Sequence, residues 1–184
     1  MKRTALLFSI GLMFALTIGG CTQSVKVEQL HQVAQTLLGN ETGDFRDLEF
    51  GMSVETTKQT EKAELVEQDE GFLYYTIELG SKNRFIDLYY FFNGSGLLDK
   101  INADIVLSSD ETANQVINDL SQYFDSRYGN AEEWTKDEDS GNQWNYEDTN
   151  NGLGEIELRM FKQISDDSRY TITLTMTKFP TYEN

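Results

Sequence analysis

Two long parts of the chain, 64–107 and 132–177, alternate between apolar and polar residues, which is the pattern of strands with one buried face. Short stretches rich in Gly, Asn, Asp and Ser separate these runs, a composition typical of turns. The four-residue turns at 80–83 and 93–96 predict a hairpin that continues into a meander. The expected strands span residues 64–68, 72–79, 84–92, 97–107, 132–136, 142–146, 155–161 and 170–177.

Three other segments have helical spacing. The clearest begins at Ser108, which forms the pattern of a capping box with Glu111, and it ends at Gly129. A second helix is capped by Ser53 and runs to about residue 62, and a short third one ends at Gly39. The apolar stripe of the first helix is Ala113, Val116, Ile117, Leu120 and Phe124, and that of the short one is Leu30, Val33, Ala34, Leu37 and Leu38.

The order of elements, a helix followed by strands, occurs twice. It predicts an α+β fold in which an antiparallel sheet has two helices packed on one face. The local sequence 63–70 also recurs at 131–138, which suggests a tandem duplication of a helix-plus-strand-meander unit, with repeats at 45–107 and 108–179. We expect one α+β domain over residues 45–180, preceded by a tether at 21–44 that contains the short helix.

The first twenty residues have the three parts of a secretory signal. Lys2 and Arg3 are followed by an apolar run from Ala5 to Ile18, which at about 14 residues is shorter than a membrane-spanning helix requires. An uncleaved anchor is the alternative to a signal peptide over residues 1–20. Ile18-Gly19-Gly20-Cys21 resembles the lipobox of bacterial lipoproteins.

The resemblance to a lipobox implies that the protein is located in the cell envelope. It implies cleavage before Cys21 and a diacylglyceryl group on its sulfur, often followed by N-acylation, so that the protein is held on the outer face of the plasma membrane or on the outer membrane. Cys21 is the only cysteine of the chain, and once it is lipidated no thiol remains for a disulfide or a nucleophile.

The net charge argues against two kinds of partner. The chain has 15 basic and 31 acidic residues, a net charge of −16. Such a surface repels phosphate backbones and anionic lipid headgroups, so we expect no nucleic-acid partner and no electrostatic membrane docking.

A second resemblance concerns the domain. The sequence 48–53, Leu-Glu-Phe-Gly-Met-Ser, opens a helix that is followed by a strand meander, and in this it resembles small envelope lipoproteins of the SmpA/OmlA type. The duplicated plan is similar to beta-lactamase inhibitor protein, in which two units pair into one concave sheet. The resemblance spans residues 45–179. It departs from the SmpA/OmlA pattern because no Gly-x-Pro follows the first helix and Pro180 is the only proline.

Residues for catalysis or metal binding are sparse in this sequence. His31 is the only histidine, and we expect it to face solvent in the tether helix. Two acidic loops, 137–141 and 148–152, lack the register of a calcium loop because the glycine comes one position early, and Glu155 also follows too soon. We therefore expect no metal, no cofactor and no enzyme activity. Paired carboxylates of a hydrolase stay open as an alternative, since sequence spacing does not reveal their separation.

An aromatic surface is the strongest candidate site. Simple hairpin register pairs Leu73, Tyr75 and Ile77 with Tyr90, Leu88 and Ile86 on the core face. The opposite face then gathers aromatic side chains, whereas the same face of the last hairpin carries Glu157, Arg159 and threonines. A tether helix or loop that covers these aromatics is the alternative. The residues expected on the face away from the helices are Phe72, Tyr74, Phe85, Tyr89, Phe91 and Leu98.

Together these patterns predict a lipid-anchored, non-catalytic binding module that presents a sheet surface to an unknown protein or envelope partner. An inhibitor or protective lipoprotein that blocks an envelope-directed enzyme is one alternative, and a carboxylate-based hydrolase is the other.

Overall fold

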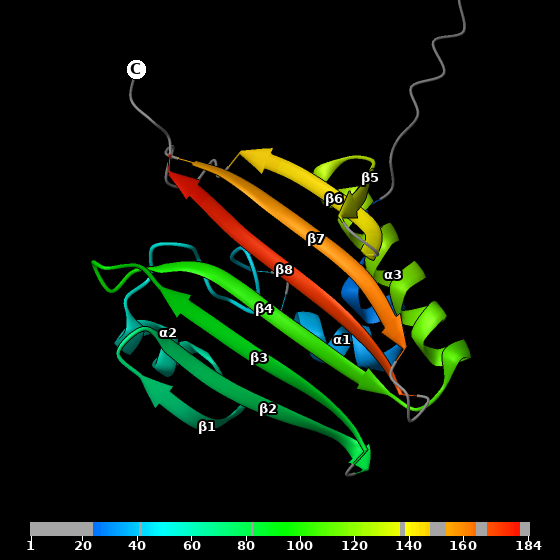
Figure 1. Ribbon diagram of the computed structural model, residues 1–184, viewed down its shortest axis with the longest axis horizontal. Coiled ribbons are helices and arrows are strands. Elements are labelled where there is room, and N and C mark those ends of the chain that lie inside the picture. Colours follow the sequence, from blue (N-terminus) through cyan, green and yellow to red (C-terminus); the bar gives the residue numbers. More distant parts are fainter. Residues whose placement is uncertain are drawn as a thin grey trace, which may run out of the picture.

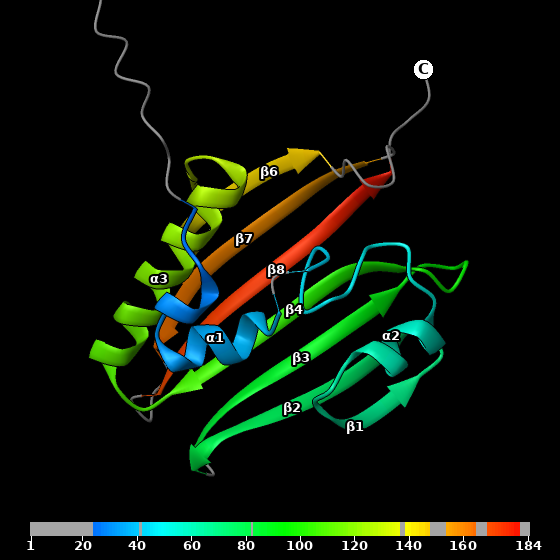
Figure 2. The same cartoon turned by 180° about the vertical axis from the view of Figure 1, so that it is seen from behind.

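A computed structural model describes residues 24–40, 42–81, 83–136, 139–147, 154–164 and 169–180. It has one sheet of eight antiparallel strands, and three α-helices cover one face of that sheet (Figures 1 and 2). The predicted α+β class is therefore confirmed. The helical elements are η1 (Val27–Gln29), α1 (Gln32–Leu38), α2 (Val54–Thr60) and α3 (Asp110–Tyr128), and the strands are β1 (Glu64–Asp69), β2 (Phe72–Ser81), β3 (Arg84–Phe92), β4 (Leu98–Leu107), β5 (Glu132–Lys136), β6 (Asp139–Glu147), β7 (Gly154–Ile164) and β8 (Tyr170–Pro180).

The strand order is β1-β2-β3-β4-β8-β7-β6-β5. Each half of the sheet is a four-stranded meander preceded by one helix, α2 or α3, and the two halves join through their last strands, β4 and β8. The repeated order of elements is thus a property of the fold, while descent from a duplicated unit stays a prediction.

The hairpin of β2 and β3 has the register that its turn predicts. Tyr75 pairs with Leu88 and Ile77 with Ile86, and the side chains of Leu73, Tyr75, Leu88 and Tyr90 are buried under the helices. Alternation places the remaining side chains of the hairpin on the opposite face.

A β-bulge at the start of β4 corrects one part of the sequence prediction. Phe91 pairs with Lys100 but Phe92 pairs with Leu98, so one extra residue stands on β4. The extra residue reverses the alternation, and Leu98 is buried in the core at 1% exposure whereas Leu97 is 39% exposed. Leu98 therefore does not belong to the open face, and Leu97 does not belong to the core.

Helix α3 supplies the main apolar stripe of the helical layer. Ala113, Val116, Leu120 and Phe124 are buried, as the spacing predicts, and Gly129 ends the helix with a positive φ of 91°. The N-cap is not Ser108, because the side chain that accepts a hydrogen bond from Thr112 N–H is that of Ser109.

Helix α1 is part of the domain, so the expected tether is wrong for residues 24–40. Val33, Ala34, Leu37 and Leu38 are buried in the same core as the sheet, which makes α1 a third helix of the layer. His31 is not a solvent-facing helix residue either, because it is half-buried and its Nδ1 caps α1 by accepting a hydrogen bond from Val33 N–H.

A buried ion pair ties the helical layer to the sheet. Arg46 donates from Nε and Nη2 to both carboxylate oxygens of Glu61, at 2.9 Å each, and from Nη1 to the carbonyls of Thr36 and Leu37 at the end of α1. Tyr90 of β3 donates its hydroxyl to Glu61 at 2.5 Å. This network links the 42–50 loop, α1, the end of α2 and the sheet through two charged side chains that are 10% and 1% exposed.

Several expectations fall on residues that lie outside the described ones. These are the signal peptide, the lipidated Cys21, the acidic loop at 148–152, and residues 137–138 of the one at 137–141. Within the described ranges, no helix is both long enough and apolar enough to span a bilayer.

Candidate functional site

The face of the sheet without helices, here called the open face, is formed by alternate residues of the strands (Figure 1). Strand pairing aligns these residues in rows that cross the whole sheet. One row runs from Tyr74 through Tyr89, Asn102, Thr175 and Arg159 to Gln143. The next runs from Thr76 through Asp87, Asp104, Thr173, Phe161 and Gly141 to Trp134.

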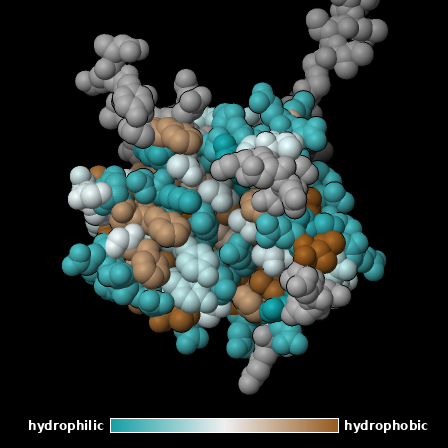
Figure 3. Space-filling view, in the orientation of Figure 1, coloured by the Kyte–Doolittle hydropathy of each residue, from teal (hydrophilic) through white to brown (hydrophobic). Residues whose placement is uncertain are grey.

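Five of the six predicted site residues lie on the open face of β2 and β3. We call this set, Phe72, Tyr74, Phe85, Tyr89 and Phe91, the aromatic cluster. The rings of Tyr74 and Tyr89 stack with centroids 4.8 Å apart, and those of Phe72 and Phe91 lie 6.5 Å apart. All five side chains are partly exposed, and Figure 3 shows apolar patches over this half of the sheet, set among hydrophilic residues.

The aromatic cluster is not covered by the short helix near the N-terminal end. Helix α1 packs on the opposite face of the sheet, next to α3, so the alternative of a tether helix folded over the aromatics is wrong (Figure 2). The cluster is available to a partner as far as the described residues extend.

A second aromatic pair lies on the far half of the open face, where the sequence predicted ordinary solvent-facing residues. Trp134 of β5 and Phe161 of β7 flank Gly141 of β6, and their ring centroids are 5.6 Å apart. A side chain at Gly141 would clash with Phe161 and the Met160 backbone, so the glycine lets the two rings meet across the middle strand. The sequence pattern did not predict this pair because it indicates a loop at Gly141, whereas the structure places this residue inside β6.

Polar residues occupy the centre of the open face. Asp87 of β3 stands directly opposite Asp104 of β4. Tyr74 donates its hydroxyl to Asp87 at 2.9 Å, and Thr173 donates to Asp104 at 2.6 Å. Burial, then the charges of Asp87 and Asp104, raise the pKa of Tyr89. Burial, then the hydrogen bond to Asp87, raises the pKa of Tyr74 to about 12.

Cations of the open face lie against aromatic rings. The Lys100 ammonium is 5.4 Å from the centroid of Phe91, and the Arg159 guanidinium is 5.1 Å from that of Trp134. Arg159 also forms an ion pair with Glu157 at 2.8 Å, so its charge is already compensated. The open face therefore combines two aromatic groups with an acidic centre.

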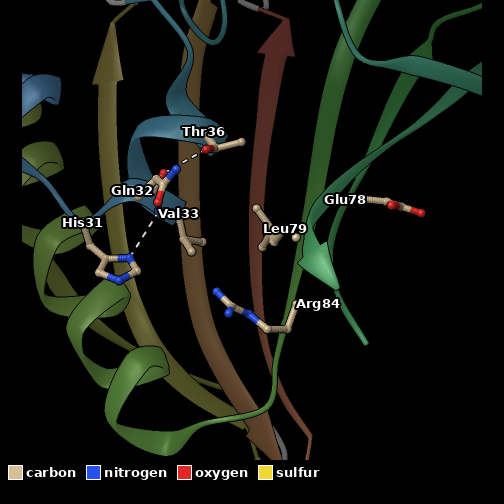
Figure 4. Close-up of a pocket in the computed structure, with 8 residues that line it drawn as sticks. His31, Gln32, Val33, Thr36, Glu78, Leu79 and Arg84 are labelled. Atoms are coloured by element: carbon tan, nitrogen blue, oxygen red, sulfur yellow. Dashed lines mark hydrogen bonds between the residues drawn. The ribbon is translucent and has the colours of Figure 1, made fainter. Parts of the chain in front are cut away.

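A separate cleft of about 340 Å³ opens on the helical side, between the start of α1 and the end of the β2–β3 hairpin. Arg84 extends across it toward His31, Leu79 lines it, and Glu78 points away from it (Figure 4). Among the described residues, no group of three His, Cys, Asp or Glu side chains is arranged to hold a metal ion.

The fold and this surface define a class: an α+β protein whose sheet has one helix-covered face and one open face with aromatic and acidic side chains. A scan against protein-family models finds no match to the chain, and searches of the curated proteins and of the solved structures find none either. The resemblances to bacterial lipoproteins and to envelope proteins of the SmpA/OmlA type therefore stay predictions.

Proposed function

We propose that this protein is a lipid-anchored, extracytoplasmic and non-catalytic binding module, and that it presents the open face of its sheet to a protein or envelope partner. Inhibition of an envelope-directed enzyme would be one form of such binding. The proposal combines the lipobox at Cys21 with the chemistry of the open face.

The aromatic cluster is the observation that carries the proposal. Aromatic side chains contribute large apolar areas, and leaving five of them partly in water is unfavourable unless another molecule covers them. Tyrosine and phenylalanine are enriched in protein–protein interfaces, where their rings pack and the tyrosine hydroxyl groups form hydrogen bonds. The stacking of Tyr74 on Tyr89 and the hydrogen bond from Tyr74 to Asp87 also hold these rings in place before a partner arrives.

Substituting both tyrosines tests the surface. We expect Tyr74→Ser/Tyr89→Ser to remain folded, because both side chains lie on the uncovered face, and to lose its partner. A photo-reactive amino acid placed at Phe85 should cross-link one protein in the cell, and the double substitution should abolish that adduct. Thermal melting of the purified protein measures the fold in parallel.

The matched control removes exposed apolar side chains elsewhere. Leu97→Ser/Ile164→Ser changes residues that are 39% and 65% exposed and lie outside the aromatic cluster, and it should leave the adduct intact. A photo-reactive residue at Gln115, on the outer side of α3, should not capture the same protein. Equal capture from both positions, or an adduct that survives the tyrosine substitutions, would contradict the proposal.

The membrane attachment has a test of its own. Cys21→Ser should leave the precursor uncleaved and unlabelled when cells grow with radioactive palmitate, because the thioether to the diacylglyceryl group cannot form on serine. The outcome against the lipid anchor is normal palmitate labelling in this variant. Such a result would leave the binding role of the open face untouched.

A further inference from the structure

The acidic centre of the open face is unusual because its two carboxylates face each other. Asp87 and Asp104 are direct partners on neighbouring antiparallel strands, and like charges in this position destabilise a sheet. The residues that donate hydrogen bonds to them are neutral: Tyr74 donates to Asp87 and Thr173 donates to Asp104. The two hydroxyl groups therefore donate hydrogen bonds to the carboxylates but do not neutralise their negative charge.

Cations in the described part of the chain do not compensate this pair. Among the described residues, no lysine or arginine forms an ion pair with Asp87 or Asp104, and Arg46, Lys58, Arg159 and Lys162 pair with other carboxylates. Lys100, on the open face of β4, lies over the ring of Phe91 instead. One further acceptor belongs to this centre, since Asn102 Oδ1 on the same strand as Asp104 is buried and has no hydrogen-bond donor. The centre of the open face, between the aromatic cluster and the Trp134–Phe161 pair, thus carries two carboxylates and an amide oxygen that lacks a donor.

We infer that the partner is a protein segment that places an arginine or lysine side chain against Asp87 and Asp104, with apolar neighbours packed on the aromatic cluster. This inference rests on the proposed function and specifies the partner's chemistry. A guanidinium or ammonium group supplies several donors and the missing positive charge, and the neighbouring stacked rings of Tyr74 and Tyr89 favour a cation. The net charge of −16 draws the same class of partner toward the surface.

The test removes the two charges and keeps their hydrogen bonds. In Asp87→Asn/Asp104→Asn, each amide oxygen can still accept from Tyr74 or Thr173, so the fold is expected to persist and to melt no lower than wild type. The control, Glu28→Gln/Glu111→Gln, makes the same change in net charge at two exposed positions outside the open face. If the double variant has a lower melting temperature than wild type, binding is measured on the single variants Asp87→Asn and Asp104→Asn instead.

The probe is a phage-displayed library of random 12-residue peptides, selected on the purified full-length protein. Peptides that bind wild type should carry arginine or lysine next to aromatic or aliphatic residues. Their affinity should fall about tenfold or more on Asp87→Asn/Asp104→Asn and stay unchanged on the glutamine control. Replacing the arginine of a selected peptide with citrulline, which keeps the shape but not the charge, should cause a similar loss, and added salt should weaken binding.

The outcomes separate the inference from the proposed function. Peptides that lack basic residues, or that ignore the aspartate substitutions but lose binding in Tyr74→Ser/Tyr89→Ser, would overturn the inferred partner chemistry and leave the binding surface standing. Peptides that ignore both sets of substitutions would count against the open face itself. The inference is also overturned if no selected peptide binds wild type more strongly than it binds the Asp87→Asn/Asp104→Asn variant.

Discussion

Replacing Arg46 with methionine should lower the free energy of unfolding by about 3–5 kcal/mol, the range found when one partner of a buried ion pair is removed. Methionine keeps much of the apolar stem and, like arginine, has to tolerate the positive φ of 54° at this position. The substitution removes the positive charge beside Glu61, whose side chain is 1% exposed. It also removes the donors to the carbonyls of Thr36 and Leu37. Urea unfolding measured by circular dichroism gives the difference.

Two comparisons show whether the ion pair is the cause. Lys58→Met removes a cation whose pair with Glu55 is exposed and 3.6 Å long, and it should change the stability by less than about 0.5 kcal/mol. Replacing both partners, in Arg46→Met/Glu61→Met, should be less damaging than the sum of the two single changes, because no charge is left buried alone. A loss below about 1 kcal/mol for Arg46→Met would mean that solvent reaches the pair.

The same pair has a signature in pH. Burial alone would raise the pKa of Glu61, but the hydrogen bonds and charge of Arg46 outweigh it and hold the pKa below its ordinary value of 4.5. A carboxyl with a lowered folded-state pKa stabilises the protein above its unfolded-state pKa, and this contribution is lost as the pH falls through the folded-state value. The stability gap between wild type and Arg46→Met depends on the pKa of Glu61 in the two folded proteins, which is higher in the variant because burial is no longer offset by Arg46. The gap should therefore narrow as the pH falls from the variant's higher pKa, through 4.5, toward the lowered pKa of wild type.

Truncating Leu120 to alanine should lower the free energy of unfolding by about 2–5 kcal/mol. Leu120 is fully buried at the centre of the apolar stripe of α3, the helix that packs on β4, β6 and β8. The loss combines the transfer of the removed carbons with the cavity that a rigid helix–sheet interface cannot close. Chemical denaturation of the purified protein measures it.

Gln115→Ala provides the control on the same helix. Gln115 is exposed, so the free energy of unfolding of this variant should lie within about 0.5 kcal/mol of the wild-type value. Similar small changes for both variants would show that the stripe of α3 is not the main contact between the helices and the sheet.

Local patterns were sufficient for much of this structure. The strands β3 and β5 have the bounds that alternation and turn residues predict, and the pairing of Tyr74 with Tyr89 follows from a four-residue turn. These features depend on neighbours in sequence, and a one-residue slip would have turned every apolar side chain of the hairpin outward.

Other features depend on contacts that sequence order conceals. The bulge at residue 99 changes the side of Leu98, although the pattern around it reads as an unbroken strand. The short helix α1 looked like part of a tether because its partners, α3 and the sheet, follow it much later in the chain. The acidic centre requires that β4 lies next to β8, since only this junction brings Thr173 to Asp104.

That junction also sets the order in which the protein can be completed. Ile101 pairs with Met176, and Ile105 pairs with Ile172. One edge of β4 therefore stays unpaired until β8, the last strand, has been synthesised and has docked on it. Closing such a distant pair requires a long loop to be ordered first, which makes it a slow step in folding. A chain made from its N-terminal end therefore exposes the edge of β4 until β8 has been synthesised. An unpaired strand edge of this kind can pair with strands of other molecules, so this interval is the one in which aggregation competes most with folding.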